Sequence, residues 1–470
     1  MLLPPCLVLA VSTLPFVVSA IPALRTSQWP IQIPEEDIRL SQSNRVMEQN
    51  DTICDAGSKQ WSGTVNLGKG RDMFFWYFES LSHPKDDPLI IWLNGGPGAS
   101  SMLGSFYEIG ACLVDKTQNS TYRNPNSWTN LANIVFIDQP IGTGFSYTED
   151  RKLWAQTLQD ATLDFDKFLD GFFALFPQLD NGKRDVHFVG ESFGGQYAPH
   201  YAAATRRDFA SIILINPWID PVYHVLARWE HICASGKDYM HFNQTLCVHM
   251  EEGYSTCETH GNECQLTQNP SICLEAFNVC LSGIQKWVEM GMEHRDWYDD
   301  RNKCLKPEDC DSGFSPVRRY LDSDSVKKAL GLKSSFKYDP MNEAFNEKWT
   351  NGVDATVPST RQIATLLDAK DTKVLILNGN NDISVPTASL VRTLDNLPWS
   401  KHAAYLTKKL SPWYYKDSSG SQQLGGELKQ VGNLALVTVN NAGHMNVHDQ
   451  PIATLSILQK WLKSRKLSVE

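Results

Sequence analysis

Residues 186–198 read VHFVGESFGGQYA, and this stretch decides the fold. Residues 186–189 form a short apolar run of the kind that indicates a buried strand. The run leads directly into Gly190-Glu191-Ser192-Phe193-Gly194, a G-x-S-x-G motif, and then into a sequence that can form a helix. A strand, a sharp turn and a helix around this motif expose the serine oxygen beside the amide hydrogens of the helix N-terminus. The motif is short enough to occur by chance, but its context predicts that Ser192 is a nucleophile.

Two later residues complete a catalytic set with this serine. A serine nucleophile needs a base, and the base needs a carboxylate that orients it. When the serine stands at such a turn, the acid and the histidine follow it in the chain, each just after a strand. Asp382 follows the apolar run 374–377, and His444 follows the run 434–439. The alternatives are a turn or capping aspartate and an ordinary loop histidine, but the shared order predicts a Ser192–His444–Asp382 triad.

The remaining apolar runs predict a sheet around these residues. They lie at 89–93, 134–137 and 212–215, with a hairpin over 61–67 and 73–78. Runs without polar alternation indicate strands that are buried on both faces, as in a parallel sheet covered by helices. Apolar residues also recur every three or four positions from Trp154 to Phe176, which predicts a helix that ends at Pro177. We therefore expect an α/β fold with a mostly parallel central sheet flanked by helices.

Two stretches depart from this alternation of strands and helices. Residues 417–426 are polar and rich in Gly and Ser, which predicts a loop. Residues 217–330 are rich in Cys and charged residues and show no strand-like runs, so we interpret them as an insertion held by disulfides. The catalytic domain is expected to span 21–470, with the insertion inside it.

Composition narrows the class of protein further. The 470 residues are 42% hydrophobic and 10% aromatic, which permits a large packed core and argues against wholesale disorder. The formal net charge of −10 makes nucleic acid a poor partner, because phosphate backbones attract basic surfaces. No internal run approaches the ~20 apolar residues of a membrane span. We expect no cofactor and no stable membrane insertion, and the sequence leaves the oligomeric state open.

The first twenty residues and the cysteines indicate the secretory route. Residues 1–20 carry no charged side chain and end Val18-Ser19-Ala20, which is typical of a signal peptide, although a buried N-terminal segment is the alternative. Cys6 lies in this segment, and an even ten cysteines remain, which favours disulfides in an oxidising compartment. Zinc is the weaker alternative, because no CxxC pair is present, and we expect no metal. The ten are Cys54, Cys112, Cys233, Cys247, Cys257, Cys264, Cys273, Cys280, Cys304 and Cys310.

Three Asn-x-Ser/Thr triplets are acceptors for N-linked glycans in that compartment, although such triplets also arise by chance. They begin at Asn50, Asn119 and Asn243.

Four motifs together resemble those of the serine carboxypeptidase family. They are Trp92-Leu93-Asn94-Gly95-Gly96-Pro97-Gly98-Ala99-Ser100-Ser101, the stretch 138–147 beginning Asp138-Gln139-Pro140, the serine motif at 190–197 and the histidine motif at 443–451. Their order matches that of the family, and they span most of the chain. The version Gly98-Ala99-Ser100-Ser101 most resembles the secreted carboxypeptidases of fungi. The resemblance implies an α/β-hydrolase fold with a disulfide-rich lid insertion over 217–330.

The resemblance also implies roles for individual residues. The main-chain amides of Gly96 and Phe193 are expected to form the oxyanion hole. The free C-terminal carboxylate of a substrate is expected to be bound by Trp92, Asn94, Glu108 and Glu191. A helix cap or a solvated side chain is the alternative for Glu108. Two carboxyls bind a carboxylate only when they carry protons, which implies an acidic working pH.

The disulfide pairing is likewise implied by the resemblance and not by the spacing. The implied pairs are Cys54–Cys112, Cys233–Cys247, Cys257–Cys280, Cys264–Cys273 and Cys304–Cys310.

The sequence thus predicts a secreted serine-type carboxypeptidase that acts on the C-termini of peptides and proteins at acidic pH. A vacuolar or lysosome-like location is less favoured. The main alternative is an acyltransferase or another acyl-ester hydrolase that uses the same triad, because nothing in a triad distinguishes water from another acceptor. A catalytically silent binding protein is disfavoured, since all three triad positions are filled. Preference for the residues on either side of the scissile bond is not predicted.

Overall fold

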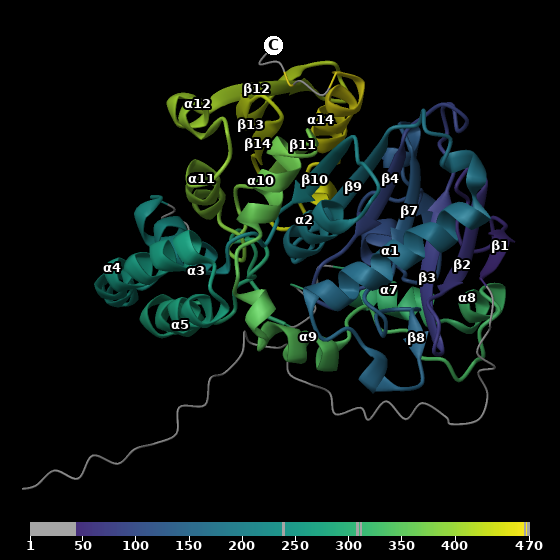
Figure 1. Ribbon diagram of the computed structural model, residues 1–470, viewed down its shortest axis with the longest axis horizontal. Helices are drawn as coiled ribbons and strands as arrows, with labels where there is room; N and C mark the ends of the chain where they lie inside the picture. Colours follow the sequence, from purple (N-terminus) through teal and green to yellow (C-terminus); the bar gives the residue numbers. More distant parts are fainter. Residues whose placement is uncertain (1–43, 237–239, 307–309, 311–312, 465–466, 468–470) are drawn as a thin grey trace, which may run out of the picture. The chain divides into compact units, whose positions relative to one another are not determined.

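The computed structural model describes residues 44–236, 240–306, 310, 313–464 and 467 (Figure 1). The expected signal peptide at 1–20 lies outside the described residues.

One large sheet organises the described chain (Figure 1). Its strands lie in the order β1-β2-β3-β7-β4-β9-β10-β11-β14-β13-β12, and β8 pairs with β3. The six strands from β7 to β14 are parallel to one another, and antiparallel strands extend the sheet on both sides. The predicted mostly parallel central sheet is therefore confirmed.

The strands of this sheet are β1 (Arg45–Gln49), β2 (Gln60–Asn66), β3 (Arg71–Phe78), β4 (Leu89–Leu93), β7 (Asn133–Ile137), β8 (Tyr147–Thr148), β9 (Val186–Glu191), β10 (Ser211–Ile215), β11 (Lys373–Gly379), β12 (Ser411–Lys416), β13 (Gln422–Val431) and β14 (Leu434–Val439). A separate pair is formed by β5 (Cys112–Val114) and β6 (Thr121–Arg123).

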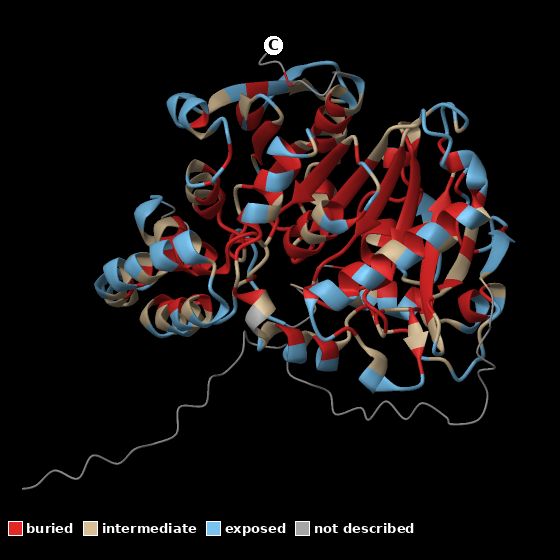
Figure 2. Cartoon of the chain, in the orientation of Figure 1, coloured by how far each residue is buried: buried red, intermediate tan, exposed pale blue. Residues whose placement is uncertain are grey.

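The central strands are buried on both faces, as their continuous apolar sequences predict (Figure 2). In β4, Leu89, Ile91 and Leu93 pack into one core cluster, while Ile90 and Trp92 pack into the cluster on the opposite face. Successive side chains of a strand point to opposite faces, so one apolar run supplies both cores.

The helices are α1 (Leu158–Leu175), α2 (Gly194–Ala204), α3 (Pro221–Trp229), α4 (Gln244–Thr267), α5 (Pro270–Cys280), α6 (Lys286–Gly291), α7 (Phe314–Leu321), α8 (Asp324–Ala329), α9 (Glu343–Thr350), α10 (Thr360–Asp368), α11 (Thr387–Asp395), α12 (His402–Thr407), α13 (Asn446–Asp449) and α14 (Pro451–Ser464). Helices α1, α2, α10 and α11 contribute to the first core cluster, and α7, α8 and α14 contribute to the second.

The helix predicted before Pro177 is α1, and its predicted apolar face is confirmed. Thr157 begins it with a capping box, in which the Thr157 hydroxyl accepts from the Asp160 amide and the Asp160 carboxylate accepts from the Thr157 amide. The aromatic rings on its inner side are buried, and Phe172 meets Phe75 of β3 edge to face at 5.3 Å between ring centroids.

The loop predicted for 417–426 was too long. Residues 422–426 belong to β13, which pairs with β12 at the margin of the sheet. A Cβ on Gly425 would lie 2.2 Å from the Trp413 ring, so this glycine serves packing between strands and does not mark a loop. The stretch looks like a loop because its polar side chains face solvent at the sheet margin.

The stretch 217–330 is helical and has two parts. Helices α3–α6 and the π-helix η5 (Glu230–Ala234) pack around a core of their own. Helices α7 and α8 instead pack against the second core cluster beneath the main sheet. We refer to α3–α6 with η5 as the helical insertion.

Disulfides join the parts of the helical insertion. Cys257–Cys280 and Cys264–Cys273 link α4 to α5, and Cys233–Cys247 links η5 to α4. Two further disulfides, Cys54–Cys112 and Cys304–Cys310, lie outside it. These five pairs are the ones that the resemblance implies.

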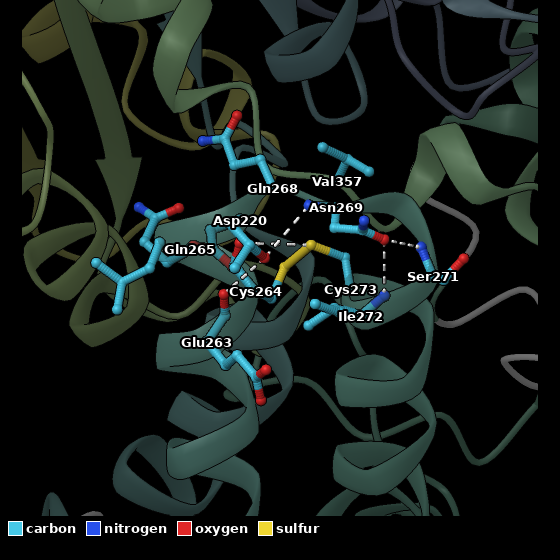
Figure 3. The surroundings of a disulfide bond; sticks show 12 residues. Asp220, Glu263, Cys264, Gln265, Gln268, Asn269, Ser271, Ile272, Cys273 and Val357 are labelled. Carbon is cyan, nitrogen blue, oxygen red and sulfur yellow. Dashed lines mark hydrogen bonds between the residues drawn. A yellow bond between two sulfur atoms is a disulfide. The ribbon is translucent and has the colours of Figure 1, made fainter.

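Figure 3 shows the turn between α4 and α5 around Cys264–Cys273. Asn269 caps α5, because its side-chain oxygen accepts from the amides of Ser271 at 3.0 Å and Ile272 at 3.4 Å. Gln268 donates to Thr360 Oγ1 at 2.6 Å. The disulfide-linked tip is thereby fastened to the start of α10.

Candidate active site

Ser192 stands at a strained turn between β9 and α2. Its φ of +56° lies in the left-handed region, which costs a non-glycine residue about 1–3 kcal/mol. Three main-chain hydrogen bonds hold it there. Ser192 N donates to Ile215 O at 2.9 Å, and Ser192 O accepts from the amides of Gly195 at 2.8 Å and Trp218 at 2.7 Å. Ser192 as a whole is half-buried.

The predicted acid and base form a buried pair. Nδ1 of His444 lies 2.6 Å from Oδ2 of Asp382, and both residues are at most 2% exposed. A carboxylate only accepts hydrogen bonds, so Nδ1 carries the proton and Nε2 is left to act as a base. The second carboxylate oxygen, Oδ1, accepts from the Val385 amide at 3.0 Å.

The topology brings the three predicted triad residues to one edge of the sheet. Strands β9, β10, β11 and β14 are consecutive and parallel. Ser192 follows β9, Asp382 follows β11 and His444 follows β14, while Asn216 follows β10. The carboxyl ends of parallel strands meet along one edge, which is where open α/β sheets hold their ligands.

Two carboxyls lie together beside the triad. Glu191, next to the serine, and Glu108, in the π-helix η1 (Gly104–Glu108), are at most 3% exposed. Asn94 bridges them, because its Nδ2 donates to Glu191 Oε2 at 2.9 Å and to Glu108 Oε1 at 3.4 Å. The two carboxyls influence each other's pKa directly, and they can hydrogen-bond to each other only when one of them carries a proton.

Burial sets the protonation of this carboxyl pair. The pKa of Glu108 is raised to about 7, because the effect of burial outweighs the lowering by hydrogen bonds from Glu191 and Asn94. The pKa of Glu191 is raised well above its usual range, first by burial and then by the charges of Glu108 and Asp382. Like charges in a dry site disfavour double ionisation, so the pair keeps a proton into the weakly acidic range.

Trp92 holds Asn94 in position. The Trp92 indole N–H donates to Asn94 Oδ1 at 2.7 Å, and the Gly104 amide donates to the same oxygen at 3.0 Å. Both bonds turn the amide NH₂ of Asn94 toward the carboxyls. Trp92 is completely buried, and its indole N–H is engaged by Asn94.

The two predicted oxyanion-hole segments are in close contact. A Cβ on Gly95 would lie 2.3 Å from the Phe193 nitrogen, so only glycine permits this approach. The next residue, Gly96, has φ +98°. Within the described chain, neither the Gly96 nor the Phe193 amide donates a hydrogen bond to another protein group.

Asp138 fixes the loop that carries Gly96. Its Oδ1 accepts from the Ser100 hydroxyl at 2.6 Å and the Ser101 amide at 2.9 Å, and its Oδ2 accepts from the Phe145 amide at 2.8 Å. Burial raises the pKa of Asp138 to about 6. The sequence places Asp138 in a motif without giving it a role, although its position directly after an apolar run was a usable signal.

Two other residues of the site were missed. Asn216 donates to Asp382 Oδ2 at 2.7 Å, and it too directly follows an apolar run. The Tyr298 ring lies 4.8 Å from the His444 ring, and Tyr298 O accepts from the His444 amide at 2.6 Å. Tyr298 belongs to the stretch without strand periodicity, so nothing in the sequence pointed to it.

The predicted glycan acceptors Asn50, Asn119 and Asn243 are all exposed. Among the described residues, no cluster of three or more His, Cys, Asp or Glu side chains is suited to hold a metal ion. In the same part of the chain, no helix has the length and apolar character to cross a membrane.

Comparison with known proteins identifies the family of the chain. The family model for serine carboxypeptidases matches residues 51–464. A carboxypeptidase Y homolog A of Trichophyton tonsurans is 31% identical over 431 residues, which cover 89% of this chain and 77% of the relative. A vacuolar serine-type carboxypeptidase of Saccharomyces cerevisiae is 29% identical over 419 residues, covering 87% and 80%.

A solved structure shares the fold. The prohormone-processing carboxypeptidase Kex1 of Saccharomyces cerevisiae superposes with a TM-score of 0.72 at 24% identity, covering 90% of this chain and 95% of that one. The α/β-hydrolase architecture is therefore confirmed. The chain belongs to the serine carboxypeptidase family and is a serine-type carboxypeptidase.

Proposed function

We propose that this enzyme removes C-terminal residues from peptides and proteins at acidic pH through an acyl-enzyme on Ser192, in a secretory or extracellular compartment. The observation that carries the proposal is the buried pair of Glu108 and Glu191, bridged by Asn94 next to the His444–Asp382 pair.

The triad supplies the chemistry. The Ser192 hydroxyl attacks the carbonyl of the last peptide bond while Nε2 of His444 accepts its proton. Asp382 keeps Nδ1 protonated and stabilises the imidazolium that forms. His444 then gives the proton to the leaving amine, and a water molecule activated by the same histidine hydrolyses the acyl-enzyme.

The amides of Gly96 and Phe193 act on the tetrahedral intermediate. They donate hydrogen bonds to the oxygen that gains negative charge, and one such donor contributes about 3 kcal/mol of transition-state stabilisation. Because neither amide has another acceptor in the described chain, no existing bond is lost when the intermediate forms.

The carboxyl pair makes the enzyme an exopeptidase. When protonated, Glu108 and Glu191 donate hydrogen bonds to the free carboxylate of the substrate, beside the amide of Asn94. Their raised pKa values extend this state above the ordinary carboxyl range. As the pH rises further, the pair loses its proton and repels the substrate carboxylate, so KM increases.

The proposed secretory or extracellular compartment is supported by the cysteines and by the exposed sequons. Ten cysteines in five disulfides fit an oxidising compartment, and the three exposed sequons fit glycosylation there. The N-terminal segment 1–20 is the proposed signal for entry. Mass analysis of the enzyme isolated from a secreting host, before and after glycan removal, tests the sequons and the cleavage.

The decisive assay compares a blocked dipeptide that has a free C-terminus with its C-terminal amide across pH. We expect hydrolysis of the free acid to be faster, most of all at acidic pH. Ser192→Ala should abolish both turnover and labelling by a serine-directed phosphonate while the fold remains intact. Full labelling of that variant at another serine would refute the triad.

The same assay addresses the acyltransferase alternative. With an alcohol or amine added as acceptor, a carboxypeptidase forms mainly the free acid product. If the transfer product dominated at acceptor concentrations far below that of water, the proposal of hydrolysis would be wrong.

A further inference from the structure

Residues 297–301 form a strap that binds the loop carrying Asp382. Trp297 O accepts from the Ser384 amide at 3.1 Å, and the Asp300 amide donates to Asn381 O at 2.9 Å. These two main-chain hydrogen bonds hold the loop at Asn381 and at Ser384, on either side of Asp382 in the sequence.

The same strap binds the loop carrying His444. Tyr298 O accepts from the His444 amide at 2.6 Å, and the Tyr298 ring packs against the imidazole. A Cβ on Gly443 would lie 2.2 Å from Tyr298 O and 2.9 Å from the Asp299 Cβ. The strap therefore lies in direct contact with the main chain that carries the base.

The Asp300 carboxylate ties this strap to both the acid loop and the helical insertion. It is completely buried, and its Oδ1 accepts from Asn381 Nδ2 at 2.8 Å. Its Oδ2 lies 2.7 Å from Nε2 of His231, which belongs to η5 of the helical insertion. The charged groups near Asp300 include Arg295, which donates to the Asp300 carbonyl at 3.4 Å, Arg301 and the adjacent Asp299.

We infer that Asp300 is a positioning residue for the reaction. Its carboxylate holds Asn381, and through Asn381 the neighbouring Asp382, at hydrogen-bonding distance from His444. The bond to His231 makes the helical insertion part of the support of the triad. The inference rests on the triad proposed above.

A positioning role predicts a defined kinetic effect. A displacement of about 1 Å in a catalytic group can lower the rate roughly 100-fold. The groups proposed to bind the substrate carboxylate, Glu108, Glu191 and Asn94, lie on other segments and have no contact with Asp300 in the hydrogen bonds above. Loss of the Asp300 carboxylate should therefore lower kcat and leave KM nearly unchanged.

The test uses Asp300→Ala and Asp300→Asn in the full chain. A serine-directed phosphonate titrates the active sites, so kcat is expressed per functional molecule. We expect kcat of Asp300→Ala to fall about tenfold or more, with KM within about twofold of the wild-type value. The rate of phosphonate labelling should fall in parallel, because labelling needs an activated Ser192 but no substrate carboxylate. Asp300→Asn keeps an acceptor for Asn381 and should lose less activity.

A second pair of variants tests the link to the helical insertion and does not depend on the folding of Asp300→Ala. His231→Ala removes one partner of Asp300 and should lower kcat. His231→Gln retains an N–H donor and should restore much of it.

Asp164→Asn is the matched control. Asp164 is also buried, and both of its oxygens accept from Arg71 Nη1 at 2.7 Å, far from the strap in sequence. This variant should lose stability but keep the wild-type kcat per titrated site.

The outcomes separate this inference from the proposed function. Absence of phosphonate labelling at Ser192 in the wild-type enzyme would overturn the triad itself. Normal labelling of the wild type, together with wild-type kcat and labelling rate per site in Asp300→Ala and His231→Ala, would overturn the positioning role alone. An equal loss of kcat in Asp164→Asn would also overturn it, because the effect would then be one of general destabilisation.

Discussion

Asn216 donates a hydrogen bond of 2.7 Å to Oδ2 of Asp382, the same oxygen that lies 2.6 Å from Nδ1 of His444. Asn216 is itself oriented, because its own oxygen accepts from Asn446 Nδ2 and from the Gly379 amide. The catalytic carboxylate is thus held by a residue that follows the neighbouring strand β10, and both residues are fully buried.

This arrangement predicts that Asn216→Ala lowers kcat about tenfold and changes KM little, since a hydrogen bond to a charged group contributes about 1.5–3 kcal/mol. Steady-state kinetics per titrated active site measure the effect. Asn133→Ala is the control. Asn133 is equally buried and is the first residue of β7. It therefore lies at the amino ends of the parallel strands, whereas the triad residues follow the carboxyl ends. An equal loss of kcat in both variants would contradict the role of Asn216.

Trp92→Phe should raise KM for substrates with a free carboxylate. The substitution removes the N–H that holds Asn94, while the Gly104 amide still binds the same oxygen. Loss of one such bond corresponds to about 1 kcal/mol, or roughly a fivefold increase in KM. KM for a substrate with an amidated C-terminus is the internal control and should not change. Equal increases for both substrates would point to a general distortion of the site.

The raised pKa of Glu108 predicts how stability depends on pH. Because the folded protein binds this proton more tightly than the unfolded chain, the free energy of unfolding falls as the pH rises from the ordinary carboxyl pKa through about 7. Replacing Glu108 with Gln removes the penalty. We expect Glu108→Gln to melt higher than the wild type at pH 8, with a smaller difference at pH 4. Thermal unfolding at both pH values measures this, and a difference that is the same at pH 4 and pH 8 would contradict the account.

The Cys264–Cys273 disulfide closes a short loop at the tip of the helical insertion. Replacing both cysteines with Ser should lower local stability by about 3 kcal/mol and speed amide hydrogen exchange in α4 and α5. The phosphonate labelling rate at Ser192 should persist, because none of the contacts described around Ser192 involves these cysteines. Unchanged exchange in both helices would show that their packing alone holds the tip.

The sheet and the triad positions could be predicted because each is encoded locally. A continuous apolar run indicates a strand that is buried on both faces, and a polar residue within the next few positions lies at the carboxyl end of that strand. That rule located Asp382 and His444, and it would have located Asn216 and Asp138 had it been applied to every run.

The strap and the division of the stretch 217–330 could not be predicted in this way. Tyr298 and Asp300 reach the site through main-chain bonds between distant segments, and no periodicity in their own segment signals those contacts. Helices α7 and α8 join the second core cluster through apolar side chains such as Val317 of α7 and Val326 of α8, whereas α3–α6 form their own core. Which of the two cores a helix packs into depends on tertiary contacts, and the local composition does not indicate those contacts.

The central claim is that Glu108 and Glu191 bind the substrate carboxylate in a protonated state. The most direct measurement is KM against pH for a free-acid substrate, in the wild-type enzyme and in Glu108→Gln with Glu191→Gln. We expect wild-type KM to rise as the pH passes the raised pKa values of the two carboxyls, and we expect the double variant to show a much flatter profile, because Gln donates hydrogen bonds at every pH. An identical KM profile in the two enzymes would contradict the claim.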